Sequence, residues 1–376
     1  MRYLFYFGHP AQYLFMRETI RRLVHSERHQ VTILIKTKDV LEALIEADGF
    51  PYTNILSMQR RVSRLAVVLS YINRLRLLIP IIVRTKPDLL VGTDATIAQL
   101  GKLFGIDRIT VVEDDYEVIH NLANLTYPFT QTILCPEVCQ VGKWTAKKAG
   151  YRGYMKLAYL HPAVFTPEPI YCEVYQLPSR FALIRLAQLT AYHDFGIRGI
   201  DSELVQTVID RLEANGLAVK ISSEAVIDAQ FAPYLLQIEP RHMHHVLAQA
   251  TLLISDSQSM SVEAAMLGVP SIRYSDLVGK ISVLEELEHT YGLTYGVHVG
   301  DRDELIARLQ QLIGLPALRE TFQQRRRTML ADKINVSEFL EWFLVNYPDS
   351  LKAMKQNPGM QNRFEGTTLT GFRSGQ

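Results

Sequence analysis

The fold is decided by residues 252–274, which read LLISDSQSMSVEAAMLGVPSIRY. The run opens with a short apolar stretch, as expected for a buried parallel strand. Small and polar residues interrupt this pattern over 255–259, and a helical pattern begins at Met260. Gly268 and Pro270 end the helix, because glycine favours a C-terminal cap and proline cannot continue a helix. The stretch therefore predicts a strand, a loop, a helix and a second strand.

The loop between this strand and helix has the properties of a phosphate-binding site. The first N–H groups of a helix have no partner within the helix, and the positive end of the helix dipole points at the loop. Glu263 follows in the first helical turns, where a carboxylate can accept hydrogen bonds from ribose hydroxyls. An ordinary α/β unit with Ser or Asp as the helix cap explains the pattern equally well. The candidate ligand-binding residues are Ser255, Asp256, Ser257, Gln258, Ser259, Met260 and Glu263.

The same stretch resembles the nucleotide-sugar loop of the GT-B superfamily, which includes non-hydrolysing UDP-N-acetylglucosamine 2-epimerases and many glycosyltransferases. The shared features are Ser-Asp-Ser at 255–257, Glu-Ala at 263–264 and Leu-Gly-x-Pro at 267–270. The resemblance implies two Rossmann-like parallel-sheet domains facing across a cleft, with the diphosphate and ribose of a UDP-sugar held by the second domain. One departure counts against an epimerase: Ser-Gln-Ser at 257–259 replaces the Gly-Gly typical of those enzymes and leaves less room for a diphosphate.

Length and composition limit the class of protein. The chain has 376 residues, which favours two domains, and a formal charge of +1, which argues against nucleic-acid binding. Its three cysteines, Cys135, Cys139 and Cys172, cannot pair completely and show no metal-ligand spacing with histidine, so we expect reduced thiols and no metal site. No run approaches the roughly 18–20 apolar residues that cross a bilayer, and no signal-peptide pattern is present. We expect a cytoplasmic protein, at most peripheral to the inner face of the membrane.

The N-terminal segment reads as a β-α-β unit, which predicts a parallel sheet. It lacks a Gly-x-Gly-x-x-Gly fingerprint, so we expect no NAD or FAD and no other cofactor. His9 lies in the loop after the first strand, and ligands bind beyond the carboxyl ends of parallel strands. His9 is therefore a candidate general base or sugar contact, and several inverting GT-B glycosyltransferases carry a histidine in this loop. A polar residue capping the loop is the alternative.

Two later strand ends of this segment carry acidic residues. Asp94 follows one apolar strand, and Glu113, Asp114, Asp115 and Glu117 crowd the end of the next. Crowding raises the pKa of at least one carboxyl group, which suits acid/base catalysis. The epimerases keep acidic catalytic residues in comparable loops, and the resemblance therefore makes Asp94, Asp114 and Asp115 catalytic candidates. The alternatives are a helix cap for Asp94 and a solvated acidic loop for the others.

The segment 59–84 is long, basic and strongly apolar, and it predicts a helix that Pro80 kinks or divides. Its arginines could rest on anionic lipid while its aliphatic face enters a membrane surface, so peripheral contact through 60–84 is one interpretation. A helix packed on the sheet with a solvated basic edge is the favoured one. The arginines are Arg60, Arg61, Arg64, Arg74, Arg76 and Arg84.

The C-terminal half opens with a predicted strand at 181–186, and the loop after it should border the cleft. Arg185 can pair bidentately with a phosphate, and His193 can bind a phosphate while Asp194 fixes its tautomer. A local Arg–Asp structural pair is the alternative. The pattern resembles a prokaryotic family of unknown function with GT-B-like organisation, and the likeness spans roughly residues 1–345.

Three prolines near residues 162–169 predict a linker. The expected organisation is an N-terminal domain on the acceptor side and a C-terminal domain on the nucleotide-sugar side. A helix then returns to the first domain, and a polar tail is disordered. The corresponding ranges are 1–165, 178–335, 336–349 and 350–376.

These observations favour a UDP-sugar-dependent glycosyltransferase of cell-surface glycan biosynthesis, with a glycan or lipid-linked acceptor. His9 or an aspartate would deprotonate the acceptor, and the helix N-terminus at 255–259 would stabilise the departing diphosphate. An epimerase that eliminates and re-adds UDP is the first alternative, and it predicts turnover without an acceptor. A nucleotide-sugar-binding protein without chemistry is the second. The sequence leaves open the sugar, the acceptor, the stereochemical course and the oligomeric state.

Overall fold

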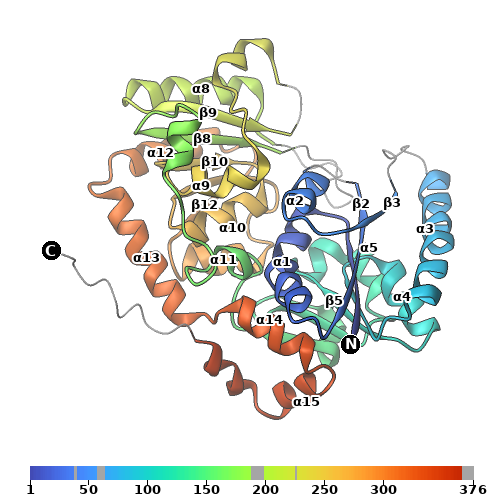
Figure 1. Ribbon diagram of the computed structural model, residues 1–376. Coiled ribbons are helices and arrows are strands. Elements are labelled where there is room, and N and C mark those ends of the chain that lie inside the picture. The colour runs from blue at the N-terminus through green and yellow to red at the C-terminus, as the bar shows by residue number, and fades with distance from the viewer. Residues whose placement is uncertain (38–39, 57–63, 188–198, 225–226, 366–376) are drawn as a thin grey trace.

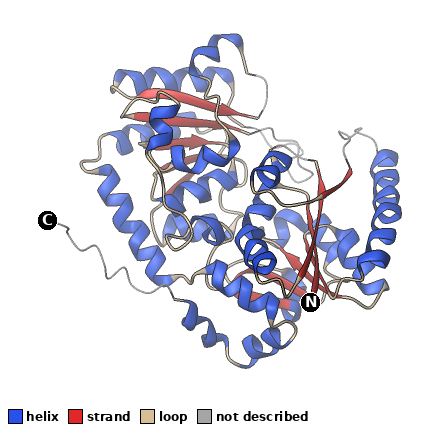
Figure 2. Cartoon of the chain, viewed as in Figure 1, coloured by secondary structure: helices blue, strands red, loops and turns tan. Residues whose placement is uncertain are grey.

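The computed structural model describes residues 1–37, 40–56, 64–187, 199–224 and 227–365. Within these residues the chain forms two α/β units, each built on a parallel sheet with helices packed against it (Figures 1 and 2). Every strand pairing between the named strands is parallel. The expected architecture of two Rossmann-like parallel-sheet domains is confirmed.

The first sheet has seven strands in the order β3-β2-β1-β4-β5-β6-β7. Its strands are β1 (Arg2–Phe7), β2 (Gln30–Lys36), β3 (Thr53–Leu56), β4 (Leu89–Gly92), β5 (Asp107–Val111), β6 (Thr132–Pro136) and β7 (Lys148–Tyr151). The helices that follow in this half are α1 (Pro10–His25), α2 (Leu41–Ala47), α3 (Arg64–Thr85), α4 (Ala95–Leu103), α5 (Tyr116–Thr126), α6 (Leu157–Leu160) and α7 (Ile170–Val174).

The second sheet has five strands in the order β12-β11-β10-β8-β9. Its strands are β8 (Phe181–Leu186), β9 (Ala218–Ser223), β10 (Leu252–Ser255), β11 (Ser271–Tyr274) and β12 (Thr294–Val297). Its helices are α8 (Ser202–Ala214), α9 (Met243–Leu247), α10 (Gln258–Leu267), α11 (Ser282–His289), α12 (Arg302–Ile313) and α13 (Leu318–Asp332). The described part of the chain ends with α14 (Val336–Val345), α15 (Asp349–Gln356) and a 3-10 helix, Pro358–Phe364.

β1 shows how the sequence builds the first unit. Tyr3, Phe5 and Phe7 enter a large core that includes α1, whereas Leu4 and Tyr6 enter a smaller core beneath α3 and α4. Both faces are apolar because helices cover both sides of a parallel sheet. The carboxyl ends of the adjacent strands β1, β4 and β5 consequently meet at one edge of a rigid sheet.

α3 is one continuous helix with Pro80 inside it. The expectation that Pro80 divides the segment is therefore wrong. The proline lies on the exposed side of α3, and the helix packs its opposite side on the first sheet. Across the described ranges of the chain, no helix combines the length and apolar character that crossing a membrane requires.

The C-terminal segment lies against the first unit, next to α1 (Figure 1). The prediction that residues 350–376 are disordered is wrong for 350–365, which form α15 and the 3-10 helix. The polar composition hid two anchoring contacts. Met354 and Phe364 are buried, and the Gln361 amide accepts from the Arg152 N–H and donates to the Gly150 carbonyl. The rest of the tail lies outside the described residues.

Candidate functional site

The loop after β10 is a short turn that its own side chains hold. Ser257 N–H donates to Ser255 Oγ at 2.8 Å, and Ser257 Oγ accepts weakly from Met260 N–H at 3.4 Å as the N-cap of α10. Gly268 ends α10 with φ at +69°, a left-handed conformation that favours glycine. The predicted strand, loop, helix and strand are therefore confirmed as β10, α10 and β11.

Asp256 turns inward rather than toward solvent. Its buried carboxylate accepts from Ala187 N–H at 2.7 Å and from Ile200 N–H at 3.3 Å. Burial raises the pKa of Asp256 to about 6. Asp256 thus joins the two ends of the segment 187–200. That segment contains the predicted ligand residues His193 and Asp194, both of which lie outside the described residues.

The N-terminus of α10 presents the open hydrogen-bond donors of the loop. The backbone N–H groups of Gln258 and Ser259 form no hydrogen bond with the residues that the structure describes. Ser257, Gln258 and Ser259 are only partly buried, whereas Met260 and the rest of the helix are buried. Free N–H groups together with the positive end of a helix dipole form an anion-binding arrangement.

Arg273 of β11 places a cation behind this helix end. It is fully buried, and it donates through Nη1 to Gln258 Oε1 at 3.0 Å. The Gln258 amide in turn donates to Ser275 Oγ at 2.8 Å. Glu285 and Glu288 of α11 lie 3.7 and 3.9 Å from Nη2 of Arg273. Arg273 was not among the predicted site residues. The sequence could have indicated it, because an arginine inside an apolar strand requires buried partners.

Glu263 lies one turn further along α10 and faces the first unit. Its Oε1 accepts from Tyr159 Oη at 2.7 Å and lies 3.3 Å from His244 Nε2. Burial works against its ionisation, but His244, Lys156 and Tyr159 outweigh burial and lower the pKa of Glu263. In this arrangement the carboxylate, predicted to contact ribose, connects α10 to α6.

Arg185 ends β8 and is held by its neighbour β9. Nη1 donates to Ser222 Oγ at 2.7 Å, and Nη2 forms an ion pair with Glu224. Among the described residues, the acidic partner of Arg185 is Glu224, which directly follows β9, and Asp194 of the expected pair lies outside the described residues. Its guanidinium stands at the same sheet edge as the loop after β10, because Arg185 pairs in register with Ser255.

At the first sheet, His9 caps α1. Its Nδ1 accepts from Ala11 N–H at 3.2 Å, so the proton of the neutral ring lies on Nε2. The sequence His-Pro-Ala recurs at 161–163, where His161 Nδ1 accepts from Ala163 N–H at 3.1 Å. Burial lowers the pKa of His161 to about 4. The repeat shows that His-Pro-Ala forms the same local hydrogen bond at two places in the chain.

Two of the predicted aspartates, Asp94 and Asp115, bind partners within the protein. Asp94 caps α4 through Thr96 N–H at 2.9 Å and pairs with Arg74, as its capping alternative required. Asp115 is buried and accepts from Gln140 N–H at 2.6 Å. It also accepts from the N–H and Oγ of Ser282, at 2.6 and 2.8 Å, at the start of α11 in the second unit.

The acidic stretch after β5 is partnered rather than solvated. Glu113 forms a buried ion pair with Lys156 and accepts from Met155 N–H at 2.6 Å. Neither Glu113 nor Lys156 was a predicted site residue. Asp114, a predicted one, is partly buried between Glu113 and Asp115. His9, Asp94 and Asp114 follow β1, β4 and β5, so the structure brings these three to one edge of the first sheet.

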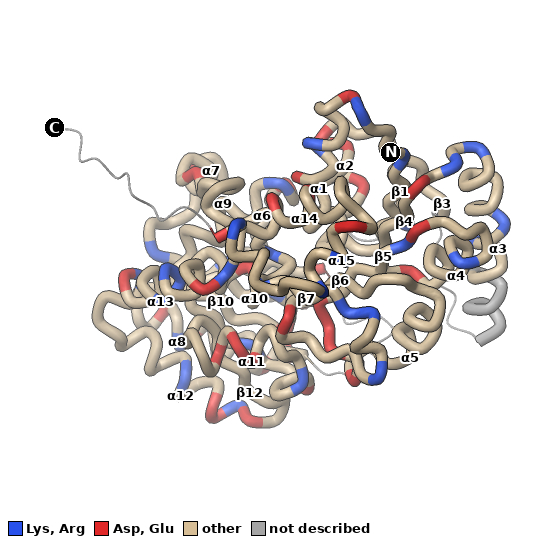
Figure 3. The backbone as a smooth tube through the Cα atoms, turned by 90° about the horizontal axis from the view of Figure 1, so that it is seen from below, with Lys and Arg blue, Asp and Glu red and all other residues tan. Residues whose placement is uncertain are grey.

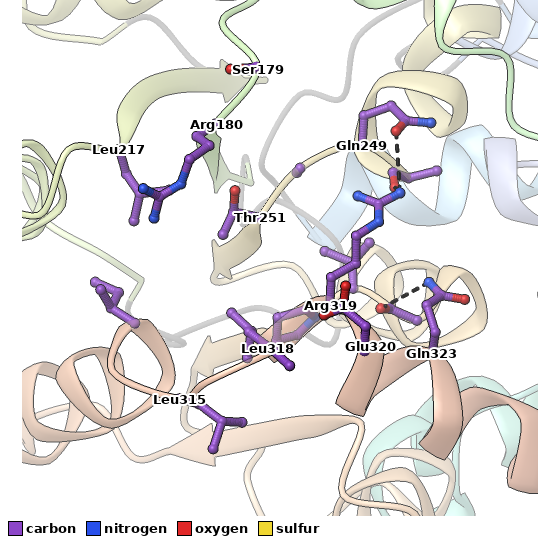
Figure 4. Close-up of a pocket in the computed structure, with 17 residues that line it drawn as sticks. Ser179, Arg180, Leu217, Gln249, Thr251, Leu315, Leu318, Arg319, Glu320 and Gln323 are labelled. Atoms are coloured by element: carbon purple, nitrogen blue, oxygen red, sulfur yellow. Dashed lines mark hydrogen bonds between the residues drawn. The ribbon is translucent and has the colours of Figure 1, made fainter.

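A cavity of about 360 Å³ lies elsewhere in the second unit, between α13 and the amino ends of β8, β9, β10 and β11 (Figure 4). Arg180, Leu217, Thr251 and Pro270, which line it, precede those four strands. None of the predicted ligand residues lines this cavity. The cavity and the loop after β10 therefore lie at opposite ends of the same sheet.

The fold is similar to that of solved structures, although no protein-family model matches the chain and no curated protein matches it. The MnaA–UDP co-structure of S. aureus has a TM-score of 0.67 at 13% identity, covering 94% of this chain and 97% of that one. The UDP-GlcNAc 2-epimerase of Neisseria meningitidis bound to UDP-GlcNAc gives 0.63 at 14%, covering 92% and 100%. The spinosyn forosaminyltransferase SpnP gives 0.61 at 13%, covering 92% and 99%.

These similarities show that the chain has the GT-B fold, as the resemblance of its central loop implied. Both epimerases and glycosyltransferases are among the proteins with this similarity. At this level of identity the similarity defines the fold, and the chemistry has to be argued from the site.

Proposed function

We propose that the protein is a nucleotide-sugar-dependent glycosyltransferase that takes a UDP-sugar at the N-terminus of α10. The observation that carries this proposal is the pair of open N–H groups at Gln258 and Ser259, backed by the buried Arg273. A diphosphate would accept from both N–H groups, and the positive end of the α10 dipole would stabilise it as a leaving group. Two solved structures with this fold contain bound UDP or UDP-GlcNAc, which supports a uridine nucleotide as the ligand.

We favour transfer to an acceptor over epimerisation because of the partners of two aspartates at the first sheet. An epimerase that eliminates and re-adds UDP needs carboxylates able to exchange protons, but Asp94 and Asp115 are committed to N–H groups and to Arg74. His9 and Asp114 follow neighbouring strands at the same edge of this sheet. We assign His9 a contact to the sugar and Asp114 the role of the base that deprotonates an acceptor hydroxyl.

The product class that we propose is a surface glycan. A GT-B transferase with an acceptor side in the first domain suits cell-surface glycan biosynthesis, with a glycan or lipid-linked acceptor. The epimerase remains a second candidate, because epimerases share this fold. A protein that binds a nucleotide-sugar without turnover is the third.

Ligand binding is the first test. Thermal-shift titrations with UDP, GDP, CMP and their sugars should show a UDP-selective rise in melting temperature. Ser257→Trp should abolish that rise by filling the space at the α10 N-terminus. The matched control is Ser179→Trp, at the cavity on the opposite end of the sheet, and it should leave the rise intact. A rise lost in Ser179→Trp instead, or no rise with any nucleotide, would refute the assigned site.

Turnover separates the three candidates. Incubation of the protein with UDP-GlcNAc alone, followed by proton NMR, should show no change at C2 of the sugar, whereas an epimerase would produce the C2 epimer. UDP release that depends on an added glycan or lipid-linked acceptor would support the transferase. Binding without either reaction would support the non-catalytic alternative.

A further inference from the structure

α3 exposes an apolar stripe that the fold does not use. Ile72, Ile79 and Val83 are spaced seven and four residues apart, so they share one face of the helix, and all three are exposed. Ile72 is 47% exposed and Val83 is 55% exposed. Leu78 and Ile82 lie about a quarter turn away from the stripe and are buried in the smaller core between α3 and the first sheet. The stripe is therefore additional to the face that holds α3 in place.

The charged residues of the segment that carries the stripe are all basic. Residues 49–87 contain no aspartate or glutamate, although the chain as a whole has 40 basic and 39 acidic residues. On α3, Arg76 and Arg84 are exposed beside the stripe, whereas Arg74 is turned to its partner Asp94. The basic residues of 49–87 are Arg60, Arg61, Arg64, Arg74, Arg76, Arg84 and Lys86.

The position of α3 leaves the stripe accessible. α3 lies at the outer edge of the first unit, on the side away from the second unit (Figure 1). The view from below also places α3 at this edge, with Lys and Arg positions near it (Figure 3). A flat surface can therefore approach α3 without meeting the second unit.

We propose that α3 docks the protein on an anionic lipid surface. Its aliphatic stripe would enter the boundary between headgroups and acyl chains, while Arg76 and Arg84 would stay with the lipid phosphates. Charge complementarity selects this occupant, because the exposed cations of α3 stand beside the stripe and 49–87 has no acidic residue. A protein interface would be expected to offer Trp or Tyr anchors, and the stripe has only aliphatic side chains. This inference does not depend on the proposed reaction.

Vesicle co-sedimentation of the full chain tests the proposal. The protein should sediment with vesicles that contain phosphatidylglycerol and much less with pure phosphatidylcholine. Added salt should weaken the binding, because salt screens the arginines. Failure to bind phosphatidylglycerol vesicles at low salt would overturn the proposal.

Two double variants separate the apolar and the charge contributions. Ile72→Asn with Val83→Asn should weaken vesicle binding by roughly tenfold, since the buried apolar area drives insertion. The matched control substitutes Ile170→Asn and Val174→Asn, which are 50% and 59% exposed on α7, and it should bind normally. Because all four side chains are exposed, each variant should keep the fold, which circular dichroism melting would verify.

Arg76→Gln with Arg84→Gln should weaken binding by about fivefold for each arginine. Its control, Arg28→Gln with Arg327→Gln, removes two exposed charges elsewhere and should leave binding unchanged. Equal binding by the α3 variants and their controls would overturn the proposal. Light scattering gives a second outcome that would overturn it. If the protein is a dimer and the stripe variants are monomers, the stripe is an interface between two copies.

Discussion

The carboxyl edges of the two sheets use their polar residues in different ways. At the first sheet, Asp94 and Asp115 are turned to partners inside the protein. At the second, Ser255 and Asp256 shape a loop and leave the N–H groups of Gln258 and Ser259 open. A charged residue at the end of a strand therefore does not by itself indicate a ligand-binding site. The backbone N–H groups of Gln258 and Ser259, which side-chain type does not reveal, identify the second sheet as the better candidate for a ligand site.

The acidic stretch after β5 shows why. Its carboxylates crowd one strand end, and two of them have partners from other parts of the chain. Glu113 pairs with Lys156, and Asp115 accepts from two backbone N–H groups and the Ser282 hydroxyl. Cations and N–H groups from distant parts of the chain neutralise the crowding, and the stretch joins the two units.

Breaking the Glu113–Lys156 pair should have the largest effect. Lys156→Met leaves the Glu113 carboxylate buried without its cation and should lower the free energy of unfolding by about 3–5 kcal/mol in urea titrations. Adding Glu113→Gln should restore much of that loss, since no unpaired charge remains. A loss below about 1 kcal/mol, as for a surface pair, would remove the contrast between the two edges.

Asp115→Ala should have the next largest effect. It removes the acceptor shared by Gln140 and Ser282 and should lower the free energy of unfolding by about 2 kcal/mol. Ser282→Ala, which loses only the hydroxyl contact, should cost less. Asp303→Ala, an exposed carboxylate on α12, is the control and should change little. Equal costs for Asp115→Ala and Asp303→Ala would contradict the bridging role.

The pH dependence of Asp256 sharpens the comparison at the second sheet. Burial raises its pKa from 3.8 to about 6, so between about pH 4 and pH 6 the folded protein binds this proton more tightly than the unfolded chain. This carboxyl group therefore lowers stability as the pH rises through that window, by up to about 1.4 kcal/mol per pH unit. Urea titrations at several pH values should show that Asp256→Asn removes this slope. If the slope of stability against pH is unchanged in the variant, the raised pKa of the buried Asp256 carboxyl group is contradicted.

Ser257→Ala should have the smallest effect on stability. Its cap to Met260 N–H is long, at 3.4 Å, so the loss should be about 0.5 kcal/mol, the low end for helix caps. Ser259→Ala, which has no capping bond, is the control in the same thermal-unfolding series. A loss above about 2 kcal/mol would mean that Ser257 supports the fold more than an anion-binding loop requires.

The sequence predicted the central stretch well because its signals are local. The apolar run, the small-residue loop and the Gly-Val-Pro ending depend on residues within a few positions of one another, and β10, α10 and β11 occur where these signals placed them. The burial of α10 was not predicted. Glu263 is buried against Tyr159 and His244. Their apposition depends on how the two units pack.

By itself the sequence determined two parallel-sheet α/β units, the stretch of β10, loop and α10, and the basic apolar helix α3. Periodicity and helix-ending residues are properties of neighbouring positions. Tertiary structure alone decided the partners of the charged groups: Arg185 pairs with Glu224, and Asp115 reaches Ser282 in the second unit. It also ordered 350–365 through Met354 and Phe364. A charge is stabilised by whatever element lies opposite it, and packing alone sets which element that is.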